Sequence, residues 1–292
     1  MAVATLAALP GAKPGPKPGP KPGPGEGPHR EGAVELPMRV LGGGLPVVEG
    51  SIGGQKVNLF VDTGTTPPIV DQALAQSLGL RLLPGSHLQL LGGTRAASWT
   101  WLPDVRIGPA HQQAVPAKVS DLSYLKRKYG VSIGAIVGFD VLGDTSFRLD
   151  YEARTMTFED VGADGIAVPL VEDSPFAVAT VEFARQKLRL LVDTGATGLV
   201  LFRPHSDRGM LGDEALKPTS VENLGGRVSA WGAAAGRHAD LRVQGTPLQT
   251  GSVFLVAKGD DFKEFDGLLS VRSLGFRALC YDRETRTVYL QF

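Results

Sequence analysis

The amino-acid sequence predicts an all-β protein of two homologous lobes. Short apolar runs rich in β-branched residues are bounded by Gly, Pro or Asp, which is the pattern of β-strands. Several features of the first half recur in the second half, and candidate helices are few and short. The chain of 292 residues can bury a sizeable core and form two lobes of ordinary domain size. We expect the lobes to span residues 34–162 and 163–292.

The first 33 residues are predicted to be a disordered leader and spacer rich in Pro, Gly and Lys. Residues 12–24 repeat Lys-Pro-Gly-Pro, a composition that cannot bury a core and favours an extended polyproline II spacer. Residues 1–9 are apolar and rich in small residues but lack a basic start, so they fit either the remnant of an export signal or a disordered tail. A periplasmic or secreted location is therefore expected, with a cytoplasmic location left open.

The predicted strands and helices follow the same duplicated order. Residues 176–183 cluster β-branched residues as a strand does, and two similar hairpins are expected at residues 147–158 and 278–290. The best helix candidates are residues 70–78, closed by Gly79, and the turn-like segments 139–142 and 271–274.

The tripeptide Asp-Thr-Gly anchors the repeat, because it occurs at residues 62–64 and again at 193–195, an offset of 131. One such tripeptide arises by chance in a Gly-rich chain. Other matches keep nearly the same offset: residues 91–93 with 224–226, 136–138 with 268–270, and 150–155 with 282–287. Two tripeptides inside a repeat of nearly constant offset predict two homologous lobes.

Each Asp-Thr-Gly follows an apolar run, residues 57–61 in one case and 188–192 in the other. A carboxylate beside a hydrophobic strand is costly unless it is hydrogen-bonded, so its double occurrence suggests that Asp62 and Asp193 meet. Two carboxylates that share a site cannot both ionise easily, and one then holds a proton while the other stays a base. Such a pair can activate water and protonate a leaving amine, which predicts acid–base hydrolysis of peptide bonds.

These motifs resemble those of the aspartic protease family, with its retropepsin-like and pepsin-like members, in a bacterial type that carries both motifs in one chain. The resemblance covers residues 34–292 and implies two homologous, β-barrel-like lobes with a cleft between them. Residues 60–65 and 191–196 match the family pattern of two hydrophobic residues, Asp-Thr-Gly, and then Thr, Ser or Ala. The resemblance implies that Asp62 and Asp193 are the catalytic residues of an aspartic endopeptidase.

The resemblance also implies supporting roles for the rest of each motif. Thr63 and Thr194 would interlock across the lobe interface, and Gly64 and Gly195 would complete the active-site loops. Thr65 would hydrogen-bond its own aspartate, a hydroxyl that the second motif lacks. This asymmetry favours Asp62 as the more readily ionised member of the pair.

Two further pairs of segments resemble family elements. Residues 136–138 and 268–270 match the element that packs under the active-site loop, but Ser270 replaces the usual Gly and would be strained if that position required φ > 0. Four glycines fall where the resemblance places the flaps, the hairpins that close over bound peptide: Gly92, Gly93, Gly225 and Gly226.

Composition and motif searches disfavour other chemistries. The 30 basic and 30 acidic residues cancel, so nothing favours nucleic acid as a partner, and no run of 18 apolar residues forms an intact membrane span. The five histidines lack metal-ligand spacing, and the single Cys280 lies in a strand-like run where a buried, inert thiol is expected. The Gly-x-Ser-x-Gly match at residues 130–134 lacks the strand before it and the helix after it that a nucleophile requires. No metal and no cofactor are implied.

We therefore expect a monomeric aspartic endopeptidase whose substrate is an extended peptide or protein segment, bound strand-like under the flaps. The alternative from another class is a catalytically inactive peptide-binding or sensor module of the same fold. Retention of two mutually repelling carboxylates argues against that alternative, because a pure binder does not need them. A structural β-protein with coincidental turns is disfavoured by the repeat.

Overall fold

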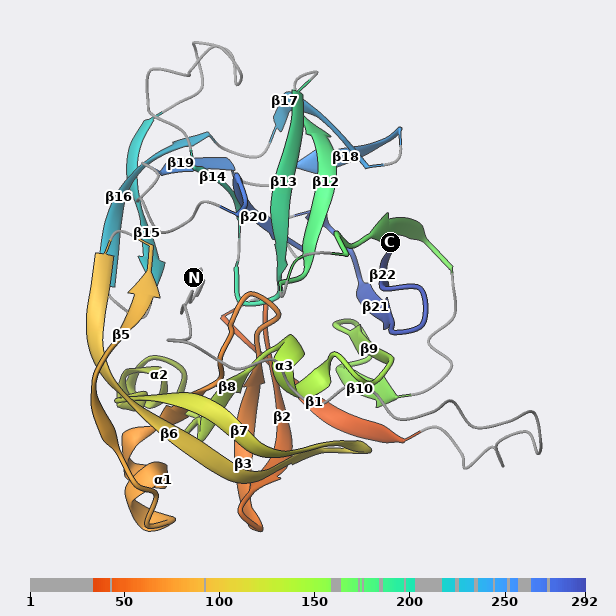
Figure 1. The fold of residues 1–292 in the computed structure, drawn as a ribbon. Helices are drawn as coiled ribbons and strands as arrows, with labels where there is room; N and C mark the ends of the chain where they lie inside the picture. Colours follow the sequence, from red (N-terminus) through yellow and green to blue (C-terminus); the bar gives the residue numbers. More distant parts are fainter. Residues whose placement is uncertain are drawn as a thin grey trace, which may run out of the picture.

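The computed structural model describes most of the chain after residue 33. The described residues are 34–42, 44–91, 93–158, 164–172, 174, 176–183, 186–196, 198–202, 217–223, 226–233, 236–243, 245–250, 253–256, 264–271 and 274–292. These residues are mostly β-strands, arranged in two sheets, with few and short helices (Figure 1). The prediction of an all-β fold is confirmed. The predicted leader, residues 1–33, lies outside the described residues.

The larger sheet combines strands from both ends of the chain, in the order β11-β22-β21-β9-β10-β1-β2-β3-β8-β4-β7-β6-β5. Its strands are β1 (Glu35–Leu41), β2 (Leu45–Ile52), β3 (Gln55–Val61), β4 (Ile69–Asp71), β5 (Leu83–Leu90), β6 (Gly93–Ile107), β7 (Ala110–Ser120), β8 (Ala135–Val137), β9 (Phe147–Asp150), β10 (Thr155–Phe158), β11 (Ile166–Pro169), β21 (Ala278–Asp282) and β22 (Thr287–Gln291). The two hairpins that the sequence predicts, β9–β10 and β21–β22, are both present.

The smaller sheet comes entirely from the second half, in the order β15-β16-β19-β14-β20-β13-β12-β17-β18. Its strands are β12 (Val178–Phe183), β13 (Gln186–Asp193), β14 (Leu199–Phe202), β15 (Lys217–Asn223), β16 (Gly226–Ala233), β17 (Gly236–Val243), β18 (Thr246–Thr250), β19 (Val253–Val256) and β20 (Gly267–Ser270).

Part of the pairing scheme occurs twice. The run β3-β8-β4-β7-β6-β5 in the larger sheet has the same order as β13-β20-β14-β19-β16-β15 in the smaller one. Strands β3 and β8 pair in parallel, as do β13 and β20, whereas β4–β8 and β14–β20 are both antiparallel. Two halves of the chain therefore build the same arrangement of strands around each Asp-Thr-Gly.

Three short helices occur among the described residues: α1 (Gln72–Ser77), α2 (Ser123–Tyr129) and α3 (Phe139–Leu142). Helix α1 starts later than residue 70 because β4 precedes it and the Asp71 side chain caps it, accepting a 3.0 Å hydrogen bond from the Ala73 amide. Helix α3 matches its prediction, and α2 was not predicted as a helix. Part of the third candidate, residues 272–273, lies outside the described residues.

Burial explains why the three residues before each motif, 59–61 and 190–192, are all apolar. Strand β3 lies between β2 and β8, and β13 lies between β12 and β20, so neither is an edge strand. Leu59 and Val61 in β3, and Leu191 and Val192 in β13, belong to one buried cluster that spans both sheets. A strand covered on both faces requires apolar residues at successive positions and not in alternation.

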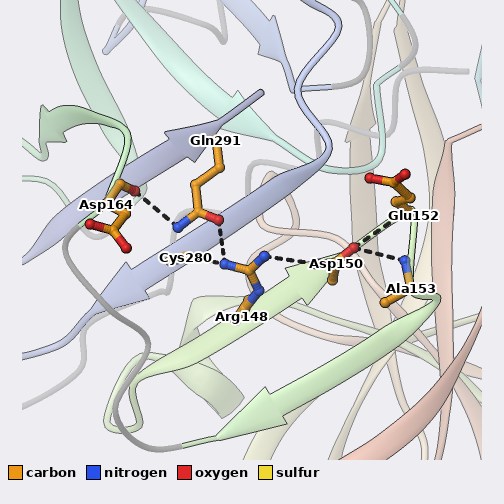
Figure 2. A network of polar contacts seen from close by, with 7 residues as sticks. All are labelled: Arg148, Asp150, Glu152, Ala153, Asp164, Cys280 and Gln291. Atoms are coloured by element: carbon orange, nitrogen blue, oxygen red, sulfur yellow. Dashed lines mark hydrogen bonds and ion pairs between the residues drawn. The ribbon is translucent and has the colours of Figure 1, made fainter.

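A polar network joins the C-terminal hairpin to β9 in the larger sheet (Figure 2). The guanidinium of Arg148 donates to Asp150 Oδ2 at 2.7 Å, to Cys280 Sγ at 3.4 Å and to the side-chain oxygen of Gln291. Gln291 in turn donates to the Asp164 carbonyl at 2.9 Å. Cys280 is fully buried and its pKa is raised by burial, so the thiol stays protonated and serves packing, as predicted.

The predicted division into lobes at residues 162 and 163 falls in the segment 159–163, which lies outside the described residues. The C-terminal strands β21 and β22 and the linking strand β11 pair within the larger sheet. No helix in the described part of the chain is long and apolar enough to span a membrane.

Candidate active site

The loops that carry the two Asp-Thr-Gly motifs meet near the centre of the molecule. Asp62 directly follows β3, and Asp193 is the last residue of β13. In Figure 1 the ends of these two strands approach one another between the two sheets. The Asp62 amide donates to the Val137 carbonyl of β8 at 2.9 Å, and Asp193 pairs with Ser270 of β20. Each aspartate is therefore held by the backbone of a buried parallel strand pair.

Thr63 and Thr194 take part in four hydrogen bonds that join the two loops in a reciprocal pattern. The Thr63 hydroxyl donates to the Val192 carbonyl at 2.6 Å and accepts from the Thr194 amide at 3.1 Å. The Thr194 hydroxyl donates to the Val61 carbonyl at 2.8 Å and accepts from the Thr63 amide at 3.1 Å. Both side chains are buried. The four bonds lock the two loops together and satisfy two carbonyls and two amides that water does not reach.

The two carboxyl groups lie against each other and are completely buried, with 0% exposure for both Asp62 and Asp193. The Oδ1 atom of each accepts a hydrogen bond within its own loop, from the Gly64 amide at 2.9 Å and from the Gly195 amide at 2.7 Å. Each Oδ2 atom is buried without a separate donor. The two carboxyls interact directly, so a proton on either one would allow it to donate a hydrogen bond to the other.

Each motif glycine packs against the opposite aspartate. A Cβ atom added at Gly64 would lie 2.7 Å from Asp193 Cγ, and one added at Gly195 would lie 2.4 Å from Asp62 Oδ2. Both distances are shorter than a van der Waals contact. Glycine is required at these two positions because any side chain would push the carboxyls apart.

The pKa of each carboxyl is raised. Burial raises the pKa of Asp62 well above its ordinary value, and the charge of Asp193 raises it further. Burial likewise raises the pKa of Asp193, to about 6, against hydrogen bonds from Asp62 and from two backbone amides that lower it. The titration belongs to the pair, since the two groups interact directly. Because both pKa values are raised, the pair keeps both protons in acid and comes to hold one proton and one negative charge only as the pH rises through about 6.

The expected asymmetry between the two aspartates is not supported. Thr65 does lower the pKa of Asp62 through a side-chain hydrogen bond. However, the backbone amide of Ala196 gives Asp193 a comparable bond. With the Gly64 and Gly195 amides, each carboxyl then has two donors in its own loop, so the Thr65 hydroxyl does not single out Asp62 as the ionised member.

The predicted strain at Ser270 is absent. Its φ is not positive, and the corresponding Gly138 is also extended, with φ −124°. Gly138 is needed for a different reason, because an added Cβ would lie 2.0 Å from the Thr65 carbonyl oxygen. At the second position the Ser270 hydroxyl instead donates to the Ala196 carbonyl at 2.6 Å. The hydrogen bond of Ser270 to Ala196 thus takes the place of the close approach of Gly138 to the Thr65 carbonyl.

The four flap glycines are only partly placed. Gly92 and Gly225 lie outside the described residues. Gly93 begins β6 opposite Leu90 of β5, and Gly226 begins β16 opposite Asn223 of β15. Each described glycine is thus the first paired residue after a hairpin turn. Strands β5, β15 and β16 lie on the left in Figure 1, away from α3, β9 and β21.

Sequence reasoning missed three polar residues near these elements. The buried ammonium group of Lys118 in β7 lies 4.0 Å over the Trp99 ring and donates to the His87 carbonyl at 2.9 Å, which holds the base of the first hairpin. Lys128 of α2 forms a 2.7 Å ion pair with Glu222 near the tip of the second hairpin. The contacts of Lys118 had one sequence signal, a lysine between the apolar residues Ala117 and Val119. The ion pair between Lys128 and Glu222 joins residues too distant in sequence to be predicted.

A Gly195→Ala substitution is expected to reduce peptide hydrolysis by about 100-fold or more, because displacing a reacting group by about 1 Å has an effect of this size. The new methyl group has no room beside Asp62 Oδ2.

The contrasting variant is Gly79→Ala, whose added methyl group meets no atom within 4 Å although the residue has φ +62°. It is expected to cost about 1 kcal/mol of stability without loss of activity. Peptidase assays and denaturant unfolding of both variants measure the difference, and a fully active Gly195→Ala enzyme would contradict the close packing.

Among the residues that the structure describes, no group of three or more His, Cys, Asp or Glu side chains is arranged to hold a metal ion. The arrangement of the site is instead that of two carboxyls able to take up and release protons.

Residues 48–141 match the family model described as aspartyl protease. This segment contains the first motif and most of α3 but ends before the second motif. Among solved structures, a retropepsin-like aspartic protease from Rickettsia conorii matches with 19% sequence identity and a TM-score of 0.34, covering 44% of this chain and 89% of that chain. No curated protein matches this chain.

Proposed function

We propose that this chain is an aspartic endopeptidase with two lobes, in which Asp62 and Asp193 activate a water molecule to hydrolyse peptide bonds. The observation that carries the proposal is the contact of two fully buried carboxyls, each with one oxygen lacking a separate donor. Burying two mutually repelling acids opposes folding, and strongly perturbed acids of this kind cluster at catalytic sites. The match of residues 48–141 to the aspartyl protease model supports the same chemistry for the first motif.

In the proposed mechanism the pair begins with one proton and holds a water molecule between the carboxyls. The ionised carboxylate takes a proton from the water as the water oxygen attacks the scissile carbonyl carbon, and the protonated carboxyl donates to the carbonyl oxygen. The tetrahedral gem-diol then collapses: one carboxyl gives its proton to the leaving nitrogen while the other carboxylate takes a proton from a gem-diol hydroxyl, which restores the singly protonated pair. The Thr63–Thr194 hydrogen bonds keep the two acids at a fixed separation throughout. These steps involve no covalent intermediate.

The repeated order of strand pairing supports an internal duplication, with residues 34–162 and 163–292 as the two lobes. In this arrangement the hairpins β5–β6 and β15–β16 act as flaps, with Gly92, Gly93, Gly225 and Gly226 at their tips. The substrate is an extended peptide or protein segment, whose backbone pairs with strand edges under the flaps. A monomer suffices, because each chain supplies both aspartates. Export to the periplasm or the medium is the proposed location.

The test is cleavage of an unstructured protein by the purified chain across a pH series, with and without pepstatin. The proposal predicts cleavage that increases as the pH rises through about 6, where the pair comes to hold a single proton, and that pepstatin abolishes. No cleavage at any pH, together with retained peptide binding, would replace the proposal with the inactive peptide-binding module.

A Thr65→Ala substitution is expected to move the pH–activity profile to higher pH by less than about one unit, because a single hydrogen bond contributes about 1 kcal/mol. The sign follows from the bond itself. The Thr65 hydroxyl stabilises ionised Asp62 and lowers its pKa, so losing the bond raises the pKa of the pair. Thr65→Ser keeps the hydroxyl and should keep the profile. A shift of the Ala variant to lower pH would contradict this role.

A further inference from the structure

A cavity of about 320 Å³ lies between the two halves of the chain, apart from the two hairpins. The first half contributes Phe139 and Asp140 of α3 and the following Asp144, and the second half contributes Phe176, Tyr281 and Arg286. In Figure 1, α3 and β21 lie to the right of the ends of β3 and β13, whereas β5, β15 and β16 lie to the left. A cavity of this size accommodates a small ligand.

One side of the cavity is aromatic. The rings of Phe139 and Tyr281 meet edge to face with centroids 4.7 Å apart, and Phe176 packs against Phe265 at 5.9 Å. Leu170 and Ala177 complete the apolar lining. This surface favours an apolar or aromatic group, which would lose contact with water on entering.

The charged lining is divided between the two halves. The first half supplies two carboxylates, Asp140 and Asp144, and the second half supplies the guanidinium of Arg286. Asp140 Oδ2 accepts a hydrogen bond of 3.0 Å from the Thr66 hydroxyl, and Arg286 donates a long one, 3.4 Å, to the Ser174 carbonyl. The guanidinium has five N–H donors in total, so this contact engages only part of its capacity.

Asp140 is the carboxylate of the lining whose pKa is raised. It retains exposed surface, yet nearby protein raises its pKa to about 6 through burial, against several hydrogen bonds that lower it. The exposed side chain of Asp140 is part of the lining of the cavity. A cationic group placed there would favour the ionised carboxylate.

We propose that this cavity binds a zwitterionic amino acid or dipeptide with an apolar or aromatic side chain. The ammonium group lies toward Asp140 and Asp144, the carboxylate toward Arg286, and the side chain among Phe139, Phe176 and Tyr281. Such a ligand has a partner for the carboxylates, for the guanidinium and for the apolar wall of the cavity. A ligand with one charge would leave the opposite side of the cavity without a partner. The site goes beyond the proposed peptidase function and does not depend on it.

Two residues that line the cavity, Thr66 and Ala177, are linked directly to the segments that carry the two motifs. Thr66, which lines it, directly follows Thr65 of the first motif. Ala177 also lines it, and its carbonyl accepts a 2.8 Å hydrogen bond from the amide of Val192, the residue before Asp193. A ligand that contacts both halves would therefore stabilise the folded protein, by an amount set by its concentration relative to its dissociation constant.

The first test measures binding of three matched probes to the full chain carrying Asp62→Asn, by calorimetry and by thermal unfolding. L-phenylalanine has both charges, phenethylamine lacks the carboxylate, and 3-phenylpropionate lacks the amine. Phenylalanine is expected to bind and to raise the unfolding temperature, and each single-charge probe should bind about tenfold more weakly or worse. The dipeptide Phe-Ala, compared with phenylalanine, distinguishes a peptide from a free amino acid as the better ligand.

The second test uses variants of the charged lining. Arg286→Gln should weaken phenylalanine binding about tenfold or more while leaving phenethylamine binding unchanged. Asp144→Asn and Asp140→Asn should weaken phenylalanine and phenethylamine but not 3-phenylpropionate; Asp144→Asn suffices if the other variant does not fold. Arg283→Gln is the matched control, because Arg283 donates to the Asp144 carbonyl but does not line the cavity. It should bind like the parent.

Absence of saturable phenylalanine binding at about 10 mM, or equal binding by the parent and Arg286→Gln, would overturn the proposal. Because the readouts are heat and unfolding temperature in a protein without the Asp62 carboxylate, neither result depends on peptidase activity. Loss of the proposed peptidase function would conversely leave the binding measurement intact.

Discussion

Asp62→Asn and Asp193→Asn are each expected to reduce peptide hydrolysis by about a thousandfold or more, because either change removes one of two acid–base groups that act on the same water. The double variant should be scarcely less active than either single variant, since residues that act as a unit are not additive. Asp282→Asn is the matched control, because Asp282 caps the turn after β21 and lies away from the dyad. Its activity should stay near that of the parent.

The same two variants are expected to be more stable than the parent at neutral pH. The folded pKa values of Asp62 and Asp193 are raised above the ordinary value of about 4. The native pair therefore binds protons more tightly than the unfolded chain, and its contribution to stability falls as pH rises from about 4 through about 6. An Asp→Asn substitution removes one titrating carboxyl, so the variant does not lose this stability as the pH rises. Denaturant unfolding should show the gain at pH 7 and little of it at pH 3, and a folded single variant with near-normal hydrolysis would contradict the shared-water mechanism.

Thr63→Val is expected to cost roughly 2–6 kcal/mol of stability, because it leaves two buried backbone groups without partners at about 1–3 kcal/mol each. These groups are the Val192 carbonyl and the Thr194 amide. Valine matches threonine in shape, so the loss reports hydrogen bonding and not a cavity. Activity should fall as well, since the bonds set the separation of the carboxyls.

Thr63→Ser separates this effect from general sensitivity of the loop, because serine retains the hydroxyl and should keep most of the stability. Thr194→Val removes the mirror-related bonds to Val61 and Thr63 and should have a similar cost. The double Val variant should lose less than the sum, since the two side chains form one network. A loss below about 1 kcal/mol for Thr63→Val in urea unfolding would show that the interlock contributes little.

The sequence was most informative where chemistry and local pattern coincide. An apolar run that ends in Asp-Thr-Gly predicted a buried strand delivering a carboxylate, and the recurrence of the motif predicted that Asp62 and Asp193 would meet. The contact of the two carboxyls at complete burial is what the structure adds. Helix α3 was also predicted, because Gly138 and the following apolar residues form a short local signal.

Features that depend on close backbone contacts could not be predicted. The requirement for Gly138 arises from the Thr65 carbonyl, 73 positions earlier in the chain, and not from a positive φ. Ser270 has no positive φ either, so the condition under which it would be strained is not met. Helix α2 was missed because Leu122 precedes it without a side-chain cap, although Gly130, with φ 73°, marks its end. Non-local strand pairing, such as β9 with β21, has no local sequence signal.

The most direct test of the central claim is the titration of the two aspartates by ¹³C NMR, with their carboxyl carbons assigned through the Asp→Asn variants. The account predicts two coupled steps, each seen at both carboxyl carbons, with at least one step well above the ordinary aspartate pKa of about 4. In the single Asn variants the remaining aspartate should titrate in one step, at a pKa no longer raised by its partner's charge. Two independent titrations near pH 4 in the parent would contradict the account, because the carboxyls would then share neither a proton nor a water molecule.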